Sequence, residues 1–326
     1  MKAIRVHRPG APEVLQLEEL AVPAARRGWV RIRVRGFGLN RSELFTRQGH
    51  SPSVVFPRVL GIECVGTVDD AGGSDLQPGQ TVAALMGEMG RAYDGGYAEY
   101  TLVPRDHVLP VRTSLPWDVL AALPETWLTA WGSVVEAMEM ASGDTLLVRG
   151  GTSSVGMAAT SLAKNRGVRV LATTRAESKA AALRANGADG VVIDTGRIAE
   201  DVRQRVPGGV DGVLELVGTH TLLDSLQAAR PGGIVCNTGM LANAWVLERF
   251  EPLEAIPSTV RLTTYHSGTT SAERSTAALQ EIVDGVAAGR YRPNLLRTFG
   301  FADIVAAHQF MEDNTSTGKL VVVIQA

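Results

Sequence analysis

The alternation of apolar and charged positions predicts a β-rich first third of the chain. Residues 29–35 read Trp-Val-Arg-Ile-Arg-Val-Arg, so apolar side chains alternate with arginines. This period of two is typical of a strand with one buried face. Further short strand-like runs follow at 63–72, 79–85 and 95–104, separated by turns that contain glycine or proline. We therefore expect a sheet of short strands in this part of the chain.

The pattern changes near residue 117, where a helical stretch to residue 138 is interrupted only by Pro124. Between residues 145 and 266, six short apolar runs alternate mostly with helical segments such as 154–167 and 176–187, which both end at a glycine. Continuous apolar strands between helices are typical of a parallel sheet covered on both faces. Six such strands predict the doubly wound dinucleotide-binding fold.

Two domains fit a chain of 326 residues. We expect the doubly wound α/β domain to span residues 121–284. The β-rich domain should combine residues 1–120 with residues 285–326, because the chain ends in another apolar strand, "GKLVVVIQA".

Composition narrows the class of protein. Hydrophobic residues make up 45% and charged residues 20% of the chain, which suits a packed globular core. A net charge of −2 without a basic block argues against a nucleic-acid partner, and the apolar runs are too short for a membrane span. Two cysteines without paired spacing, Cys64 and Cys236, predict a reducing compartment, so we expect a cytoplasmic protein.

The segment "LLVRGGTSSVGMAA" is the strongest functional signal. It places a glycine-rich turn between a strand and a helix, where a helix N-terminus can bind a pyrophosphate. Gly151 would permit the tight turn, and Gly156 would let helix and strand pack closely. Ser153 replaces a glycine of the usual pattern, and positive φ costs serine roughly 1–2 kcal/mol. Either the loop avoids that region, or the hydroxyls of Ser153 and Ser154 compensate by binding phosphate. The expected phosphate-binding residues are Gly151, Thr152, Ser153, Ser154, Val155 and Gly156; the alternative is an ordinary strand–helix turn.

The end of the next strand indicates which dinucleotide binds. An NAD-specific site carries an acid about 20 residues after the loop to bind the ribose hydroxyls. This chain instead has Thr174, Arg175 and Lys179, which suit a 2′-phosphate because arginine can engage it as a fork. Glu177 weighs against this reading, and solvated charges at a helix start are the alternative. The pattern favours NADPH.

Five segments in a fixed order resemble the medium-chain dehydrogenase/reductase superfamily, in particular its zinc-free quinone oxidoreductase branch. They are "GLNRSELFTRQG" (38–49), "VLGIECVGTV" (59–68), "DGGYAEYTLVP" (94–104), the glycine-rich loop (150–156) and "TSTGKLVVVI" (315–324). The resemblance implies a GroES-like β-rich catalytic domain joined to a six-stranded Rossmann domain that binds the cofactor.

The resemblance also implies that no zinc is bound. Zinc-dependent members use a Gly-His-Glu triplet where this chain has Gly61-Ile62-Glu63, and a cysteine ligand where it has Asn40. A catalytic zinc needs three protein ligands and an open position. We therefore expect no metal, and we expect Glu63 to be a buried, paired acid that supports the cofactor cleft.

Further site residues follow from the family. Asn40 would face the nicotinamide or substrate, and Phe45 would line the substrate pocket where many quinone reductases carry a tyrosine. His266 could shuttle a proton, although a surface histidine is the more ordinary reading. The remaining residues expected at the cofactor are Thr129, Val217, Gly218, Thr238, Gly239, Tyr265, His266, Ser267 and Lys319.

These features together predict an NADPH-dependent oxidoreductase that transfers hydride to a small-molecule electron acceptor without a metal. The acceptor would be a quinone or another activated, α,β-unsaturated carbonyl, which needs little polarisation. Two alternatives stay open: an enoyl-thioester or alkenal reductase, and an NADPH-binding sensor or structural protein without turnover. By analogy with the family we expect a homodimer through the sixth strand, residues 260–266.

Overall fold

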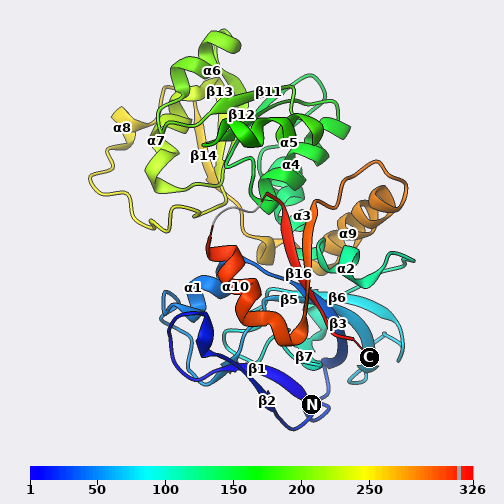
Figure 1. Ribbon diagram of the computed structural model, residues 1–326. Coiled ribbons are helices and arrows are strands. Elements are labelled where there is room, and N and C mark those ends of the chain that lie inside the picture. Colours follow the sequence, from blue (N-terminus) through cyan, green and yellow to red (C-terminus); the bar gives the residue numbers. More distant parts are fainter. Residues whose placement is uncertain (314–316, 326) are drawn as a thin grey trace. The chain divides into compact units, whose positions relative to one another are not determined.

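The computed structural model describes residues 1–313 and 317–325, which form two compact units (Figure 1). The first unit comprises residues 1–125, 270–288 and 295–326; the second comprises 126–269 and 289–294. The sequence analysis placed its divisions at 120/121 and 284/285. The structure instead groups residues 270–284, most of helix α9 (Ala272–Ala287), with the first unit.

The first unit is built on two sheets. Their strands are β1 (Lys2–Val6), β2 (Leu15–Glu19), β3 (Trp29–Gly38), β4 (Arg58–Val59), β5 (Glu63–Asp70), β6 (Thr81–Leu85), β7 (Tyr100–Pro104), β8 (Val108–Pro110), β15 (Leu295–Gly300) and β16 (Lys319–Val323). The small sheet has the order β2-β1-β4, and the large one the order β15-β16-β3-β5-β6-β8, with β7 also pairing with β3. Strand β3 buries Val30, Ile32 and Val34 as its alternation predicts. The last strand, β16, pairs antiparallel with β3 and so adds to this sheet.

Helices complete the first unit: α1 (Arg41–Arg47), α2 (Trp117–Ala121), α9 and α10 (Ile304–Glu312). Helix α1 begins at a capping box, in which Asn40 is the N-cap and Glu43 the third helical residue. In the core, the rings of Phe37 and Tyr97 stack with centroids 4.5 Å apart, and the Tyr97 hydroxyl bonds Nε2 of His308 at 3.1 Å.

The second unit is built on one fully parallel sheet. Its strands are β9 (Thr145–Arg149), β10 (Arg169–Thr174), β11 (Gly190–Ile193), β12 (Val210–Glu215), β13 (Ala229–Asn237) and β14 (Arg261–Thr264). The order β11-β10-β9-β12-β13-β14 reverses direction at β9, which is the arrangement of the doubly wound dinucleotide-binding fold. The predicted fold class is thereby confirmed.

Helices flank this sheet or connect its strands: α4 (Ser154–Asn165), α5 (Ala180–Ala185), α6 (Ala199–Arg205), α7 (Thr219–Ala228) and α8 (Pro252–Ala255). Helix α3 (Pro124–Trp131) leads from the first unit into the second and continues as a π-helix, Gly132–Ala137. The two glycines that end the predicted helices, Gly167 and Gly187, have φ of 80° and 111°. Among the described residues, no helix combines the length and apolar character needed to cross a bilayer.

Gly156 lies in the first turn of α4, against the glycine-rich loop. A Cβ atom at this position would lie 2.5 Å from the carbonyl oxygen of Gly150 and 2.9 Å from Cα of Gly151. Both are backbone atoms, so the helix and the loop would have to move apart to admit a methyl group.

We therefore predict that Gly156→Ala lowers the free energy of unfolding by about 1–3 kcal/mol, the usual cost of overpacking. Urea denaturation followed by circular dichroism measures this change. Gly300→Ala is the matched control, because its Cβ would meet only the end of the Asp303 side chain, at 3.0 Å. Equal effects of the two substitutions would contradict the prediction.

Candidate functional site

A buried polar cluster in the first unit joins four residues: Asn40, Glu43, Glu63 and Lys319. Asn40 caps α1, Glu43 lies in its first turn, Glu63 begins β5, and Lys319 begins β16. Glu43, Glu63 and Lys319 are each 1% exposed. Charged side chains are almost never buried to this degree unless they are paired.

The Lys319 ammonium is the centre of this cluster. It donates to Oδ1 of Asn40 at 2.6 Å and to Oε1 of Glu63 at 2.9 Å. The Asn40 amide nitrogen also donates to Oε1 of Glu63 at 2.9 Å, and the Glu125 amide at the start of α3 donates to Oε2 of Glu63 at 2.9 Å. The structure thus brings together three of the predicted site residues, and Glu63 is the buried, paired acid that the sequence suggested.

This arrangement leaves the Asn40 side chain with partners at both its oxygen and its nitrogen. Its expected orientation toward the nicotinamide or substrate stays a prediction, as does the expected contact between Lys319 and a cofactor phosphate.

The donor set of the cluster does not fit a zinc ion. Asn40 and Ile62 stand where zinc-dependent members carry a cysteine and a histidine ligand, and a lysine ammonium already holds the Glu63 carboxylate. Across residues 1–313 and 317–325, no three His, Cys, Asp or Glu side chains are grouped so that they could hold a metal ion. The cation that Asn40 and Glu63 hold in this cluster is the Lys319 ammonium.

Glu43 is a member of this cluster that the sequence analysis missed. Burial raises its pKa from the ordinary 4.5 to about 7, while bonds from backbone amides, including one from Ile62 at 3.0 Å, work in the opposite direction. The backbone amide of Asn40 also donates to the Glu43 carboxylate, at 3.1 Å. The Asn-x-x-Glu spacing of a capping box was the available signal in the sequence.

Phe45 and Cys64 lie near this cluster along the chain. Phe45 is buried in α1, with its ring edge-on to His50 at a centroid distance of 6.3 Å. Its predicted place in a substrate pocket is untested. Cys64 is buried in β5, and burial raises the pKa of its thiol well above the usual range, as expected for a small apolar side chain.

The glycine-rich loop of the second unit shows how Ser153 replaces the glycine of the usual pattern. Ser153 has φ −70° and ψ 162°, so the loop avoids positive φ there. The Ser153 hydroxyl donates to the Gly150 carbonyl at 2.7 Å and accepts from the Gly156 amide at 3.1 Å, which caps α4. The tight turn expected at Gly151 falls on Gly150, whose φ is 86°. Gly151 instead permits close packing, because a Cβ there would lie 2.9 Å from the Thr173 carbonyl.

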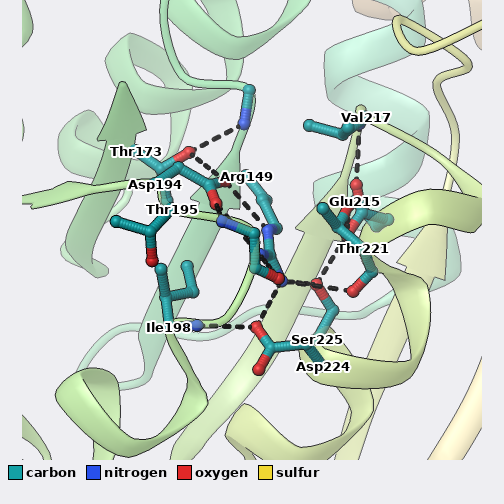
Figure 2. A network of polar contacts seen from close by, with 12 residues as sticks. Arg149, Thr173, Asp194, Thr195, Ile198, Glu215, Val217, Thr221, Asp224 and Ser225 are labelled. Carbon is teal, nitrogen blue, oxygen red and sulfur yellow. Dashed lines mark hydrogen bonds and ion pairs between the residues drawn. The ribbon is translucent and has the colours of Figure 1, made fainter. Parts of the chain in front are cut away.

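Beneath this loop lies a buried ionic network centred on Arg149 (Figure 2), which the sequence analysis missed. Arg149, the last residue of β9, is fully buried, and its guanidinium forms a fork to Asp194 with two bonds of 3.0 Å. It also donates to Asp224 at 2.7 Å and to the Ser225 hydroxyl at 3.1 Å. The only sequence signal was an arginine at the end of an otherwise apolar strand.

The network continues to the end of β12 through Glu215. This buried carboxylate accepts from the Val217 and Gly218 amides at 2.7 and 3.0 Å, and from the Ser225 hydroxyl at 2.6 Å. Burial raises its pKa, although the bond from Ser225 and the other donors oppose the shift. Glu215 thereby fixes the turn before α7, where Gly218 has φ 104°. Val217 and Gly218 lie at the carboxyl edge of the sheet, where ligands bind in this fold.

At the end of β10, the residues expected to select the cofactor differ in their surroundings. Thr174 is buried and bonds within its own turn, donating to the Ala176 carbonyl at 3.2 Å. Arg175 is exposed, and Lys179 is partly buried at the end of the following 3₁₀ turn. No acid occupies the end of β10 itself. The nearby acid Asp194 follows the neighbouring strand β11, and its amide bonds the Thr174 carbonyl at 2.8 Å.

A second group of predicted residues gathers around the π-helix. The Ser133 hydroxyl donates to the Thr129 carbonyl at 2.8 Å and bonds the Thr238 hydroxyl at 2.9 Å. The ring of Tyr265 lies against Gly132, where a Cβ would come within 1.8 Å of it. Thr129, Thr238 and Tyr265 therefore lie around this helix, and π-helical turns are frequent at functional sites. Their expected place at the cofactor stays a prediction.

The other predicted residues of this unit have mainly structural surroundings. Gly239 packs against the backbone of Leu216, whose carbonyl oxygen would lie 2.3 Å from an added Cβ. His266 is exposed and accepts a bond from the Gly268 amide at 3.2 Å, whereas Ser267 is buried. Thr152, Ser154 and Val155 lie in the loop and at the start of α4, partly buried. Their roles at the cofactor stay predictions.

The raised pKa of Glu43 gives a pH test of the first cluster. Because the folded state holds this proton more tightly than the unfolded chain, the stabilisation is complete at low pH and is lost as pH rises toward 7. The difference in unfolding free energy between wild type and Glu43→Gln should change by up to about 3 kcal/mol from about pH 5 to about pH 8, with wild type losing more. Urea denaturation at both pH values measures it; an identical pH dependence of the two proteins would contradict the assignment.

The comparisons with known proteins agree with this geometry. Residues 26–113 match the family described as "Alcohol dehydrogenase GroES-like domain", and residues 186–322 match the one described as "Zinc-binding dehydrogenase". Human quinone oxidoreductase is 26% identical over 334 residues, covering 99% of this chain and 98% of that protein. The 2-haloacrylate reductase of a Burkholderia species is also 26% identical, over 335 residues, covering 98% of each chain.

Solved structures show the same relationship. AibC superposes with a TM-score of 0.89 at 28% identity, covering 100% of this chain and 96% of its own. A mycobacterial protein in complex with NADPH superposes with a TM-score of 0.87 at 26% identity, covering 99% of each chain. With both domain families matched and relatives aligned from end to end, the chain is an oxidoreductase that belongs to the medium-chain dehydrogenase/reductase superfamily, in its quinone oxidoreductase branch.

Proposed function

We propose that this protein transfers hydride from NADPH to a quinone or another activated, α,β-unsaturated carbonyl, without a metal. The observation that carries the proposal is the buried Lys319 ammonium, which bonds Asn40 and Glu63, in a cluster whose side chains do not form a zinc site. A zinc ion polarises a carbonyl and acidifies an alcohol, and a buried, paired ammonium does neither to the same degree. Simple alcohol oxidation therefore lacks its usual catalyst in this chain.

Electron-poor acceptors need less assistance from the protein. Bound NADPH supplies the hydride, and the resulting oxyanion or enolate is delocalised and takes its proton from water. The protein's contribution is then binding, orientation and the exclusion of side reactions. Backbone amides at the start of α4 support phosphate binding, because a helix N-terminus carries unsatisfied N–H groups and a partial positive charge.

The preference for NADPH over NADH rests on the end of β10. Arg175 is exposed there and can form a fork with a 2′-phosphate, which Lys179 can also approach. An NAD site would have a carboxylate at this position, and a carboxylate would repel the phosphate. The mycobacterial relative solved with NADPH supports the same choice.

The similar proteins are named for different acceptors, so we propose a class of acceptor and not a single compound. A quinone oxidoreductase and a 2-haloacrylate reductase resemble the chain equally, at 26% identity. Both names are consistent with hydride addition to an electron-poor double bond or ring. The second candidate is therefore an enoyl-thioester or alkenal reductase, which saturation of crotonyl-CoA would distinguish from quinone turnover.

We also propose that the protein is cytoplasmic and forms a homodimer through β14. This strand, Arg261–Thr264, is the last in the sheet order and pairs on one side with β13. An edge strand of this kind can extend its sheet with the same strand of a second copy. Sedimentation velocity would report a mass near twice that of the 34.6 kDa chain, and a monomer at all concentrations would refute the dimer.

The central experiment measures acceptor-dependent oxidation of NADPH and NADH with a panel of quinones and enones. We expect wild type to use NADPH preferentially and Arg175→Ala to reduce kcat/KM for NADPH by about tenfold or more, because a charge-assisted bond to phosphate is lost. The rate with NADH should be nearly unchanged. Arg184→Ala, an exposed arginine on α5, is the matched control.

Two results of this experiment would contradict the proposed function. An unchanged preference in Arg175→Ala would refute this cofactor assignment. Tight NADPH binding with no hydride transfer to any acceptor would instead support a sensor or structural role.

A further inference from the structure

The Arg149 network connects the carboxyl ends of four neighbouring strands. Arg149 ends β9, Thr173 lies near the end of β10, Asp194 follows β11, and Glu215 ends β12. In this fold the dinucleotide binds at this edge of the sheet. The network therefore lies beneath the expected cofactor site, and Arg149, Asp194 and Glu215 were not expected to contact the cofactor.

Asp194 is the acid of the network nearest in sequence to the predicted 2′-phosphate site, residues 174–179. Its amide bonds the carbonyl of Thr174, the residue before Arg175. Its carboxylate, however, is turned inward and is 7% exposed (Figure 2). There it accepts two bonds of 3.0 Å from Arg149, one of 2.9 Å from the Gly196 amide and one of 3.4 Å from the Thr173 hydroxyl.

Among the described residues, Arg149 is the only cation that bonds the Asp194 carboxylate, and all of its N–H groups have acceptors. Besides the fork to Asp194, it donates to Asp224, to Ser225 and to the carbonyls of Thr221 and Gly196, at 3.2 and 3.0 Å. Burial opposes ionisation of Asp194, yet the bonds and charge of Arg149 outweigh it and hold the pKa of that carboxyl below its usual range. Asp194 is therefore a carboxylate whose charge is compensated from inside the protein.

We propose that Arg149 is a positioning residue for cofactor choice: by holding the Asp194 carboxylate inward, it keeps the strand end beside Thr174 open to a 2′-phosphate. The inference rests on the proposed NADPH dependence and adds a residue that selects the cofactor without touching it. Without Arg149, Asp194 would lose two of its four hydrogen bonds and its counter-charge. The freed acid would lie beside the place where NAD-specific sites carry the acid that binds the ribose hydroxyls.

A second link ties the same pair to the phosphate loop. The Thr173 hydroxyl that bonds Asp194 also accepts from the Gly150 amide at 3.0 Å. A merely structural role for Arg149 would therefore weaken binding of both dinucleotides through this loop. A role in cofactor choice changes the ratio of the two affinities, and this ratio is what the test must measure.

The experiment determines dissociation constants for NADPH and NADH by fluorescence titration, with thermal unfolding to verify the fold. The variants are Arg149→Gln, Arg149→Lys and the double variant Arg149→Gln/Asp194→Asn. Arg230→Gln is the matched control. Arg230 also forms an ion pair with an aspartate, Asp211, but this pair is partly exposed and lies at the start of β12, the opposite end from Glu215.

We expect Arg149→Gln to shift the affinity ratio toward NADH by about tenfold, as one uncompensated charge near a phosphate requires. Arg149→Lys keeps the charge and should largely keep the wild-type ratio. The double variant removes the acid's charge and should restore the ratio, and it carries the test if Arg149→Gln alone does not fold. Arg230→Gln should leave the ratio unchanged.

Equal weakening of both cofactors in Arg149→Gln, or a double variant that prefers NADH, would overturn the proposal while leaving NADPH dependence intact. A wild type that prefers NADH would overturn the proposed function as well.

Discussion

The pairing of Lys319 with Glu63 is the interaction on which the buried polar cluster of the first unit depends. Both side chains are about as buried as core leucines, and their charged atoms are 2.9 Å apart. Removing two charges from water costs several kcal/mol, which the pair recovers only if the remaining donors and acceptors are also satisfied. Asn40 and the Glu125 amide meet this requirement. Loss of one partner would leave a buried charge unpaired, at a cost of about 3–5 kcal/mol.

The second unit also contains a buried cation paired with carboxylates, and here the cation is Arg149. Arg149 compensates Asp194 and Asp224, and hydroxyl groups connect it to Glu215. In both units one buried cation joins segments that are distant in the chain and meet at the ends of strands. Such networks fix geometry strongly, because a partly satisfied network is costlier than an apolar core. Each unit thus uses a buried ion pair to connect strand ends that are distant in the sequence.

Local patterns in the sequence were enough to predict the strands of the parallel sheet and several other elements, although not short strands such as β4 or helices such as α9. The alternation in β3 and the apolar runs of β9 to β14 depend on neighbouring residues, so their periodicity is visible in the sequence. Glu63 was correctly expected to be buried and paired. Its partner could not be identified, because Lys319 lies 256 residues later and reaches it only through the pairing of β16 with β3.

The phosphate loop shows the same limit on a smaller scale. Its glycines predicted a tight turn, but the positive φ belongs to Gly150 and not to Gly151. Which of the two glycines takes the positive φ depends on how the loop packs against Thr173 of β10. This contact joins residues that are distant in the sequence. The role of Arg149 was equally hidden, since its three side-chain partners, Asp194, Asp224 and Ser225, lie 45 to 76 residues away.

The first cluster also bears on how this chain differs from zinc-dependent members of the superfamily. Restoring a histidine at Ile62 would supply one ligand but would place it beside an ammonium that already holds Glu63. A divalent ion and that ammonium would repel each other at short range, and in a buried site this repulsion is weakly screened. Asn40 would also remain engaged with Lys319. Recovering a zinc site would therefore require changes at three positions together, which supports the proposal that the acceptor reacts without a Lewis acid.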